Sequence, residues 1–347
     1  MARLSVGLLL ATAAVVTTLY AMNVTFSITE EEAIQRELRL ATTTEELNRR
    51  IDEALVRDDI EDALMYAEVA AYMNRTLSPE TQERLVAAQS GAAAALRSTT
   101  GFASGFVTGG GDSIAELAGA VTSDLTVVGD VRDIVIEGGK MIVGEDYSPL
   151  ILGLSVVGIA VTGATVATGG GGAPVRLGVS IVKLARRTGN LTVEFAQTLG
   201  RMTAQAVNPA ELARLLRQTN LTDMRATQNA IANYAGGVRQ AQIFTVMTRM
   251  GDIGRTAGPG EAVRLLRYVR TAEELDDVAG MSARLGRKTR GVIELTGRTG
   301  LRAFKTALNV FEFLLERILA FGTWLLVLFG LGVGRNIVRR GRHSRPF

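Results

Sequence analysis

The sequence contains no cysteine, and its single histidine, His343, lies near the carboxyl end. These absences exclude disulfides, thiolate metal sites, cysteine nucleophiles and catalytic or metal sites built from several histidines. The remaining Asp, Glu, Ser, Thr, Lys and Tyr residues show no paired arrangement typical of catalysis. We therefore predict no enzyme activity, no catalytic residue, no cofactor and no metal site.

Aromatic residues make up only 5% of the chain, and the charges are distributed unevenly along it. Residues 23–175 carry 23 acidic and 10 basic side chains, whereas residues 176–306 carry 10 acidic and 21 basic ones. A basic half can face anionic lipid headgroups, nucleic acid or the acidic half of the same chain. Because aromatic side chains for base stacking are scarce, we predict lipid or intramolecular pairing and no nucleic-acid partner.

One uncharged stretch near the carboxyl end, residues 318–334, reads ILAFGTWLLVLFGLGVG. At ~1.5 Å per residue, this stretch spans roughly 26 Å as a helix, close to the ~30 Å hydrocarbon core of a bilayer. Arg317 and Arg335 flank it and can reach the headgroups. A core helix normally keeps a polar face, which this stretch lacks. We predict a transmembrane helix here, with a buried core helix as the alternative.

The amino-terminal segment is uncharged from Leu4 to Thr29, after a single Arg3. Its apolar part, residues 4–22, is long for the hydrophobic region of a cleaved signal peptide. A cleavage site after Ala21 would also place Leu19 where a small residue is expected. We predict an uncleaved signal anchor, with a cleaved signal and a soluble helix as alternatives.

Charges beside the two predicted spans indicate their orientation. Five arginines between Arg335 and Arg345 follow the last span, and three glutamates follow the first. Positive charge is retained on the cytoplasmic side of a membrane. The sequence thus predicts a protein of the bacterial inner membrane, with both termini cytoplasmic and residues 23–317 mostly periplasmic. The Ala, Gly, Arg and Val bias of the composition favours a bacterial source.

Helical periodicity dominates between the spans. We predict a mainly α fold: a membrane-anchored helical bundle with N- and C-terminal transmembrane helices and a Gly-rich apolar hairpin in the middle. Thr43 followed by Glu46, and Ser78 before Pro79, predict two capped helix starts. The predicted segments are 1–22 (signal anchor), 23–98 (acidic helical hairpin domain), 99–146 (Gly-rich linker and short helices), 147–187 (apolar Gly-rich hairpin), 188–306 (basic helical domain), 307–334 (transmembrane helix) and 335–347 (basic cytoplasmic tail).

The acidic domain has the general character of a tetratricopeptide-type helical hairpin, without the repeat period of that family. Small residues on the stripe of Ala63, Ala67, Ala70 and Ala71 suit close antiparallel packing of two helices. An ordinary helical bundle is the favoured interpretation, and a peptide-binding groove is the alternative.

Residues 124–145 read DLTVVGDVRDIVIEGGKMIVGE. Asp130, Asp133 and Glu137 lie three and four residues apart, on one helix face, where carboxylates either form a solvated surface or bind a cation. We favour the solvated surface. The stretch VVGDVRD, with Gly144-Glu145 after it, resembles the short pre-toxin segments that precede toxin modules in secreted bacterial polymorphic toxins. The resemblance implies an association with secretion, although no recognisable nuclease or peptidase module follows.

No charge occurs between Tyr147 and Val175. Residues 149–168 form an apolar helix with Gly153, Gly158 and Gly163 at regular spacing, and such small residues allow close helix packing in lipid or in a protein core. A four-glycine turn and a short apolar arm follow. Two interpretations remain open: a hairpin that inserts into the membrane, and a hairpin buried in the core of the folded domain.

The basic domain contains two copies of the pattern P-x-E-x-x-R-L-L-R, beginning at Pro209 and Pro259. Each copy is predicted to start a helix, because proline and glutamate both favour the first turn. The paired arginines either contact phosphates and lipid headgroups or form a solvated, salt-bridging face. The predicted lipid or phosphate contacts, including three in the tail, are Arg214, Arg217, Arg264, Arg267, Arg335, Arg339 and Arg340.

Two functions are compatible with these features. The first is a membrane-anchored scaffold or interaction module of the bacterial envelope, with membrane lipids as partners and a protein partner or a second copy bound through small-residue helices. The second is a membrane-active or toxin-delivery protein that inserts its Gly-rich hairpin into bilayers.

Overall fold

A computed structural model describes residues 31–90, 127–168, 172–235, 242–306 and 316. Within these ranges the regular structure is helical and no strand occurs, which confirms the mainly α prediction. No helix in the described ranges has the length and apolar character required to cross a bilayer. The predicted terminal spans and the tail, with the predicted contact residues Arg335, Arg339 and Arg340, lie outside the described residues.

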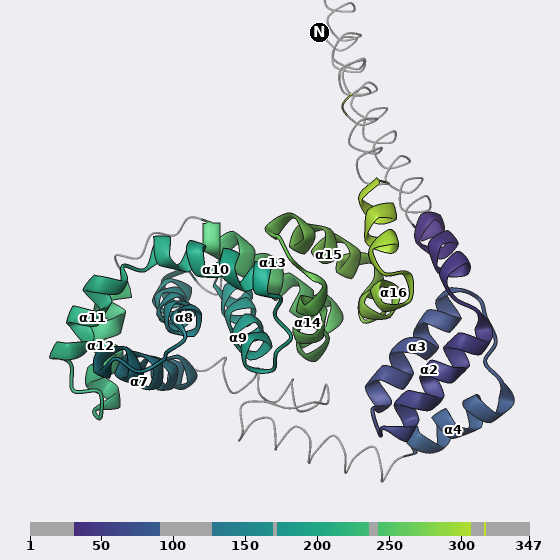
Figure 1. Cartoon of the computed structure of the whole chain (residues 1–347), viewed down its shortest axis with the longest axis horizontal. Coiled ribbons are helices and arrows are strands. Elements are labelled where there is room, and N and C mark those ends of the chain that lie inside the picture. Colours follow the sequence, from purple (N-terminus) through teal and green to yellow (C-terminus); the bar gives the residue numbers. More distant parts are fainter. Residues whose placement is uncertain (1–30, 91–126, 169–171, 236–241, 307–315, 317–347) are drawn as a thin grey trace, which may run out of the picture. The chain divides into compact units, whose positions relative to one another are not determined.

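The chain divides into two compact units. Figure 1 labels the helices of the described residues. One comprises Met1–Leu40 and Arg302–Phe347, and its described residues 31–40 are helical, with Ile34 and Leu38 buried. The other unit, Ala41–Leu301, holds most of the described helices. The features discussed below all lie within this second unit.

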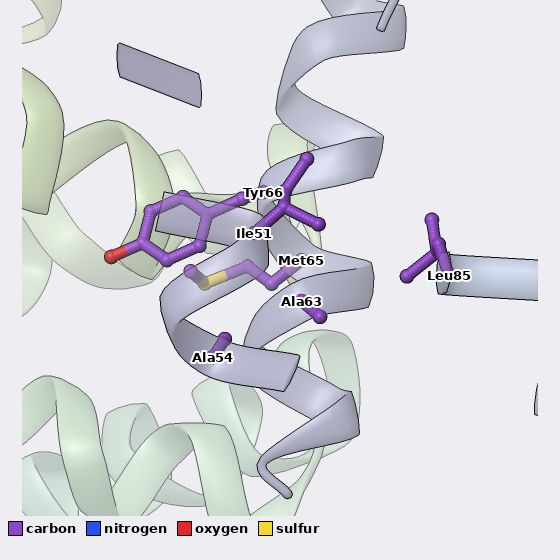
Figure 2. Close-up of a cluster of buried hydrophobic side chains, with 6 residues drawn as sticks. All are labelled: Ile51, Ala54, Ala63, Met65, Tyr66 and Leu85. Carbon is purple, nitrogen blue, oxygen red and sulfur yellow. The ribbon is translucent and has the colours of Figure 1, made fainter. Parts of the chain in front are cut away.

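Three helices begin the second unit: α2 (Thr44–Val56), α3 (Ile60–Tyr72) and α4 (Pro79–Gln89). Both predicted capped starts are confirmed, because the Thr43 hydroxyl accepts a hydrogen bond from the Glu46 amide and the Ser78 hydroxyl accepts one from the Thr81 amide. The apolar faces meet in a cluster of buried side chains (Figure 2), namely Ile51, Ala54, Ala63, Met65, Tyr66 and Leu85.

Six helices form the middle of the unit, and the long apolar helix α8 is their core. The side chains of α8 from Leu150 to Val157 are buried, and none of them is more than 8% exposed. Helices α7, α9, α10 and α12 pack against α8. The six helices are α7 (Val127–Val143), α8 (Pro149–Thr168), α9 (Ala173–Arg187), α10 (Val193–Ala206), α11 (Pro209–Gln218) and α12 (Met224–Ala235). In the described structure this hairpin packs against other helices of the unit, and its insertion into a membrane stays a prediction.

Helix α9 also packs closely against α13 (Gln242–Ala257), because both helices carry glycine at the contact. A Cβ atom added at Gly178 would lie 1.9 Å from the carbonyl oxygen of Met247, and one at Gly251 would lie 1.9 Å from that of Pro174. No side chain fits in such a space, so the two backbones approach as closely as small residues permit.

The last helices of the unit are α14 (Pro259–Leu265), the short 3₁₀ turn η1 (Leu266–Tyr268), α15 (Ala272–Leu285) and α16 (Lys288–Thr296). Helices α11 and α14 start at Pro209 and Pro259, as both copies of the repeated pattern predict. Helix α14 contacts α9, α13 and α16, and α16 contacts α3. The acidic α3 and the basic α14–α16 region are therefore neighbours in space.

Candidate functional site

A cavity of about 670 Å³ lies among α2, α3, the α9–α10 loop and the α14–α16 region. Three carboxylates, Asp59, Asp62 and Glu294, contribute to its wall. Seven arginines also line it: Arg50, Arg57, Arg264, Arg267, Arg270, Arg290 and Arg298. Three further acids pair with arginines of the lining, Glu46 with Arg50, Glu261 with Arg290 and Glu274 with Arg298. The cluster therefore keeps a small net positive charge, which favours anions inside the cavity.

The amino-terminal end of α3 supplies two of the carboxylates. Asp59 is the N-cap residue, and its side chain accepts a hydrogen bond from the Asp62 amide at 3.2 Å. Asp62 lies in the first turn of the helix. Acidic residues are favoured at this end because they complement the exposed amides and the helix dipole. Local sequence thus fixes both carboxylates at the edge of the cavity.

Arg264 of α14 bridges this pair of aspartates. Its Nη1 donates to Asp62 Oδ1 at 2.6 Å, and its Nη2 donates to Asp59 Oδ2 at 3.1 Å. Arg264 is only 7% exposed. A buried cation needs such partners, because desolvation would otherwise destabilise its charged form.

Arg290 of α16 holds the deepest contacts in the cluster. Its Nε and Nη2 donate to the two carboxylate oxygens of Glu261 at 2.5 and 3.0 Å, and Nη1 donates to Glu294 at 3.0 Å. Burial opposes the charge of Arg290, but the hydrogen bonds and charge of Glu261 outweigh it and raise the pKa of Arg290. The guanidinium therefore stays charged and also contacts Asp62.

Glu294 accepts hydrogen bonds from two phenols as well as from Arg290. Tyr268 donates at 2.9 Å, and Tyr66 donates to the other carboxylate oxygen. The ring of Tyr66 belongs to the α2–α3 cluster, and its hydroxyl points away from Leu85 (Figure 2). Burial and the charge of Glu294 raise the pKa of Tyr268 to about 12, so this phenol is a neutral donor at physiological pH.

Two arginines of the cavity differ from the rest. The Nε and Nη2 atoms of Arg267 both donate to Asn190 Oδ1, a neutral oxygen, and Asn190 is itself buried. Arg267 and Arg270 are both exposed, and Arg270 lies on the chain between η1 and α15. Within the described residues, no carboxylate forms an ion pair with either arginine. The other lining arginines pair with acids, including Glu46, Glu261 and Glu274 just outside the lining, so Arg267 and Arg270 supply the positive charge that remains inside the cavity.

The structure separates the arginines that the repeated pattern treats as equivalent. Arg264 and Arg267 line the cavity, whereas Arg214 and Arg217 are exposed on α11 and do not. The predicted lipid or phosphate contacts of all four arginines stay predictions. Arg264 already forms ion pairs with Asp59 and Asp62. Sequence reasoning missed Arg290, Asn190 and Arg270. The only sequence signal for this cluster is the contrast between the acidic first half and the basic second half of the chain, which predicts lipid or intramolecular pairing.

A second ion cluster lies between α7 and α9. Lys183 is completely buried and its Nζ is 2.9 Å from Asp130 Oδ1, with Asp133 also in contact. Arg176 lies 3.8 Å from Asp130, and Arg187 pairs with Asp133. Burial alone would raise the pKa of Asp133, but the charges of Lys183 and Arg187 hold it below its usual value.

The predicted solvated surface on α7 is therefore wrong for Asp130 and Asp133, which are 2% and 4% exposed. Glu137 completes the face by accepting a hydrogen bond from the Ser148 amide and pairing with Lys140. The alternative of a cation site finds no support among the described residues, where no group of three or more acidic or histidine side chains can hold a metal. Basic side chains, chiefly Lys183 and Arg187, form ion pairs with Asp130 and Asp133 instead.

Chemically, the cavity offers guanidinium and phenol donors, while its carboxylates are engaged with arginines and tyrosines. Such an arrangement can hold an anion through charge-assisted hydrogen bonds. Comparisons of the chain with known protein families, with curated proteins and with solved structures found no match. The inference of function therefore rests on the geometry and the sequence.

Proposed function

We propose that this chain is an α-helical binding module of the bacterial envelope, and that its arginine-lined cavity holds an anionic group of a ligand or partner. One observation carries the proposal: seven arginines and three carboxylates line one cavity of about 670 Å³. A cavity of this size suits a small molecule or the end of a larger one. The excess positive charge would be compensated by the bound anion.

The state of the carboxylates supports a binding role rather than acid–base catalysis. Asp59, Asp62 and Glu294 each accept hydrogen bonds from an arginine, and Glu294 accepts two more from tyrosines. A general base needs a carboxylate that can reach the substrate proton. The groups left to contact a ligand are instead donors of positive charge.

The membrane placement belongs to the same proposal. It rests on the uncharged stretches 4–22 and 318–334 and on the arginines after the second stretch. With both termini in the cytoplasm, the unit Ala41–Leu301 would lie in the periplasm. A scaffold or interaction module anchored in this way would present its cavity to periplasmic ligands or to the outer leaflet.

The alternative of a hairpin that inserts into bilayers requires α8 and α9 to leave their partners. That movement would carry Lys183 away from Asp130 and Asp133 or take all three into hydrocarbon. Either change is costly, because separating a buried ion pair leaves uncompensated charge. We therefore favour the binding module.

The test is an anion titration of the full-length chain in a mild detergent. Phosphate, sulfate and succinate are added while thermal unfolding is followed by circular dichroism. A bound anion raises the melting temperature according to its affinity. We expect at least one of these anions to raise it in the wild type, and the increase to disappear in the double variant Arg267→Gln/Arg270→Gln.

The matched control is Arg225→Gln, which removes an exposed arginine of α12 that does not line the cavity. This variant should respond to anions as the wild type does. The proposal is wrong if no anion raises the melting temperature, or if the double variant responds as strongly as the control.

A further inference from the structure

The arginine-lined cavity carries features that specify a class of anion. We infer that its ligand presents a phosphate group with two negative charges, as a phosphomonoester does. This inference rests on the proposed anion-binding function and narrows it to one chemistry. Two observations support it: Arg267 and Arg270 have no described carboxylate partner, and Arg267 is hydrogen-bonded to the buried Asn190.

Arg267 is oriented by a buried amide. Its Nε and Nη2 donate to Asn190 Oδ1, and the Asn190 Nδ2 donates to Thr188 Oγ1 at 2.8 Å. Asn190 is only 7% exposed, so the amide is fixed by its surroundings. One edge of the guanidinium is thus fastened to a neutral group, while its charge remains uncompensated by any described carboxylate.

The other edge of the same guanidinium keeps its donors for a ligand. Arginine has five N–H donors in a planar fork, and Asn190 engages the side formed by Nε and Nη2. The side formed by Nη1 and Nη2 has no acceptor among the described residues. Two parallel donors at that spacing match two oxygens of a phosphate. A preorganised arginine of this kind binds without first losing side-chain freedom.

Charge decides between a phosphomonoester and a carboxylate. Arg267 and Arg270 both line the cavity without a described acidic partner, so two positive charges are left for a ligand. A carboxylate brings one negative charge on two oxygens. A phosphomonoester brings about −1.5 to −2 at pH 7 on three acceptor oxygens. The phosphomonoester therefore compensates more of the surplus and can contact several arginines together.

The inference predicts a pH dependence that arginines cannot produce themselves. The second proton of a phosphomonoester leaves near pH ~6, whereas guanidinium groups remain charged throughout this range. The dianion fraction rises about fourfold between pH 5.5 and pH 7.5 for a second pKa of ~6. Sulfate has a similar shape and keeps two charges across the range, so it serves as the reference for any change in the protein.

The experiment is isothermal titration of the full-length chain in detergent with glycerol 3-phosphate, sulfate and succinate at both pH values. We expect the affinity for glycerol 3-phosphate to rise about fourfold with pH, relative to sulfate, and to exceed that for acetate, a monocarboxylate added in a parallel titration. Arg267→Gln and Arg270→Gln should each weaken it roughly tenfold, since each removes charge-assisted hydrogen bonds. Arg225→Gln should leave it unchanged.

A second arm identifies the source of the phosphate. Micelles doped with phosphatidic acid present the phosphomonoester on a lipid, and micelles doped with phosphatidylglycerol present a diester. Arg267-dependent binding of phosphatidic acid alone supports a lipid source, and binding of glycerol 3-phosphate supports a soluble one.

The inference is overturned if acetate or phosphatidylglycerol binds as tightly as the phosphomonoesters, or if the affinity for glycerol 3-phosphate does not rise with pH. In either case, anion binding that is weakened by Arg267→Gln would still support the proposed anion-binding function. If none of the anions binds, the proposed function fails as well.

Discussion

The two copies of P-x-E-x-x-R-L-L-R have the same charged residues, but the glutamate and the first arginine lie in opposite environments. In the copy on α14, Glu261 is 1% exposed and Arg264 is 7% exposed. In the copy on α11, the corresponding Glu211 and Arg214 are exposed. Both copies start at a proline, but α11 buries only Leu212 and Leu216, whereas α14 is buried at every position from Gly260 to Leu265. The pattern therefore determines the helix, but not what its charged residues do.

The difference between the copies comes from their neighbours. Helix α14 packs against α16 and lies next to α3, which bring Arg290, Asp59 and Asp62 to its charged face. Helix α11 packs against α7 and α12, and its charged residues remain exposed. A charged residue thus becomes structural only where distant helices supply the opposite charge. Lys183, which belongs to neither copy, follows the same rule through α7.

The largest effect is expected from Lys183, because it is the most deeply buried charge. Lys183→Met keeps the length of the side chain but leaves Asp130 and Asp133 with fewer cations. Removing one partner of a buried ion pair costs about 3–5 kcal/mol of unfolding free energy. Urea unfolding of the full chain, followed by circular dichroism, measures this loss. Lys140→Met, which breaks a surface pair with Glu137, should cost at most about 1 kcal/mol.

The next test compares the copies directly. Arg264→Met should destabilise the chain by about 2–4 kcal/mol, somewhat less than Lys183→Met because the cavity admits solvent near Asp59 and Asp62. Arg214→Met removes the corresponding exposed arginine and should change stability by no more than about 0.5 kcal/mol. The same urea titrations measure both variants. Equal effects of the two substitutions would show that the environments do not differ as described.

Local sequence was sufficient to predict how helices begin. Thr43, Ser78, Pro209 and Pro259 all act as caps or first-turn residues, because caps depend on residues within one turn. The burial and ion pairing of Arg264 could not be predicted from local sequence, because its partner Asp62 lies 202 residues away in the sequence.

The same limit explains the wrong prediction for α7. The spacing of Asp130 and Asp133 indicated one helix face correctly, but it carried no information on whether solvent or another helix covers that face. A Cβ atom at Gly158 would lie 2.4 Å from Asp130 Oδ2, so this glycine of α8 makes room for the carboxylate. The regular glycines of α8 were noticed in the sequence, whereas their relation to a charge on α7 appears only in three dimensions.

A smaller difference between the copies is expected at their glutamates. Glu261→Gln keeps the shape of the side chain but weakens two charge-assisted hydrogen bonds from Arg290, at a cost of about 1.5–3 kcal/mol. Glu211→Gln removes only a favourable charge in the first turn of α11, worth about 0.3–1 kcal/mol. Thermal unfolding of the two variants side by side measures the difference. A larger loss for Glu211→Gln would contradict the assignment of the buried and exposed copies.

The smallest expected effect is on the pH dependence of stability, and it separates buried carboxylates from exposed ones. The pKa of Asp133 is below its usual value, with Lys183 and Arg187 as the cause. The folded state therefore binds this proton less readily than the unfolded state. The resulting stabilisation is complete above the unfolded value of ~3.9 and is lost as the pH falls through the folded pKa.

Urea titrations between pH 7 and pH 2 check this prediction. The difference in stability between the wild type and Asp133→Asn should narrow as the pH falls below ~4, because the protonated aspartic acid no longer gains from the nearby cations. Lys183→Met removes one of those cations, so its acid transition should begin at a higher pH than that of the wild type. If the stability difference between the wild type and Asp133→Asn were the same at all pH values, the ion pairs of Asp133 would contribute nothing to stability. The buried carboxylates of α7 would then not differ in this respect from the exposed ones of α11.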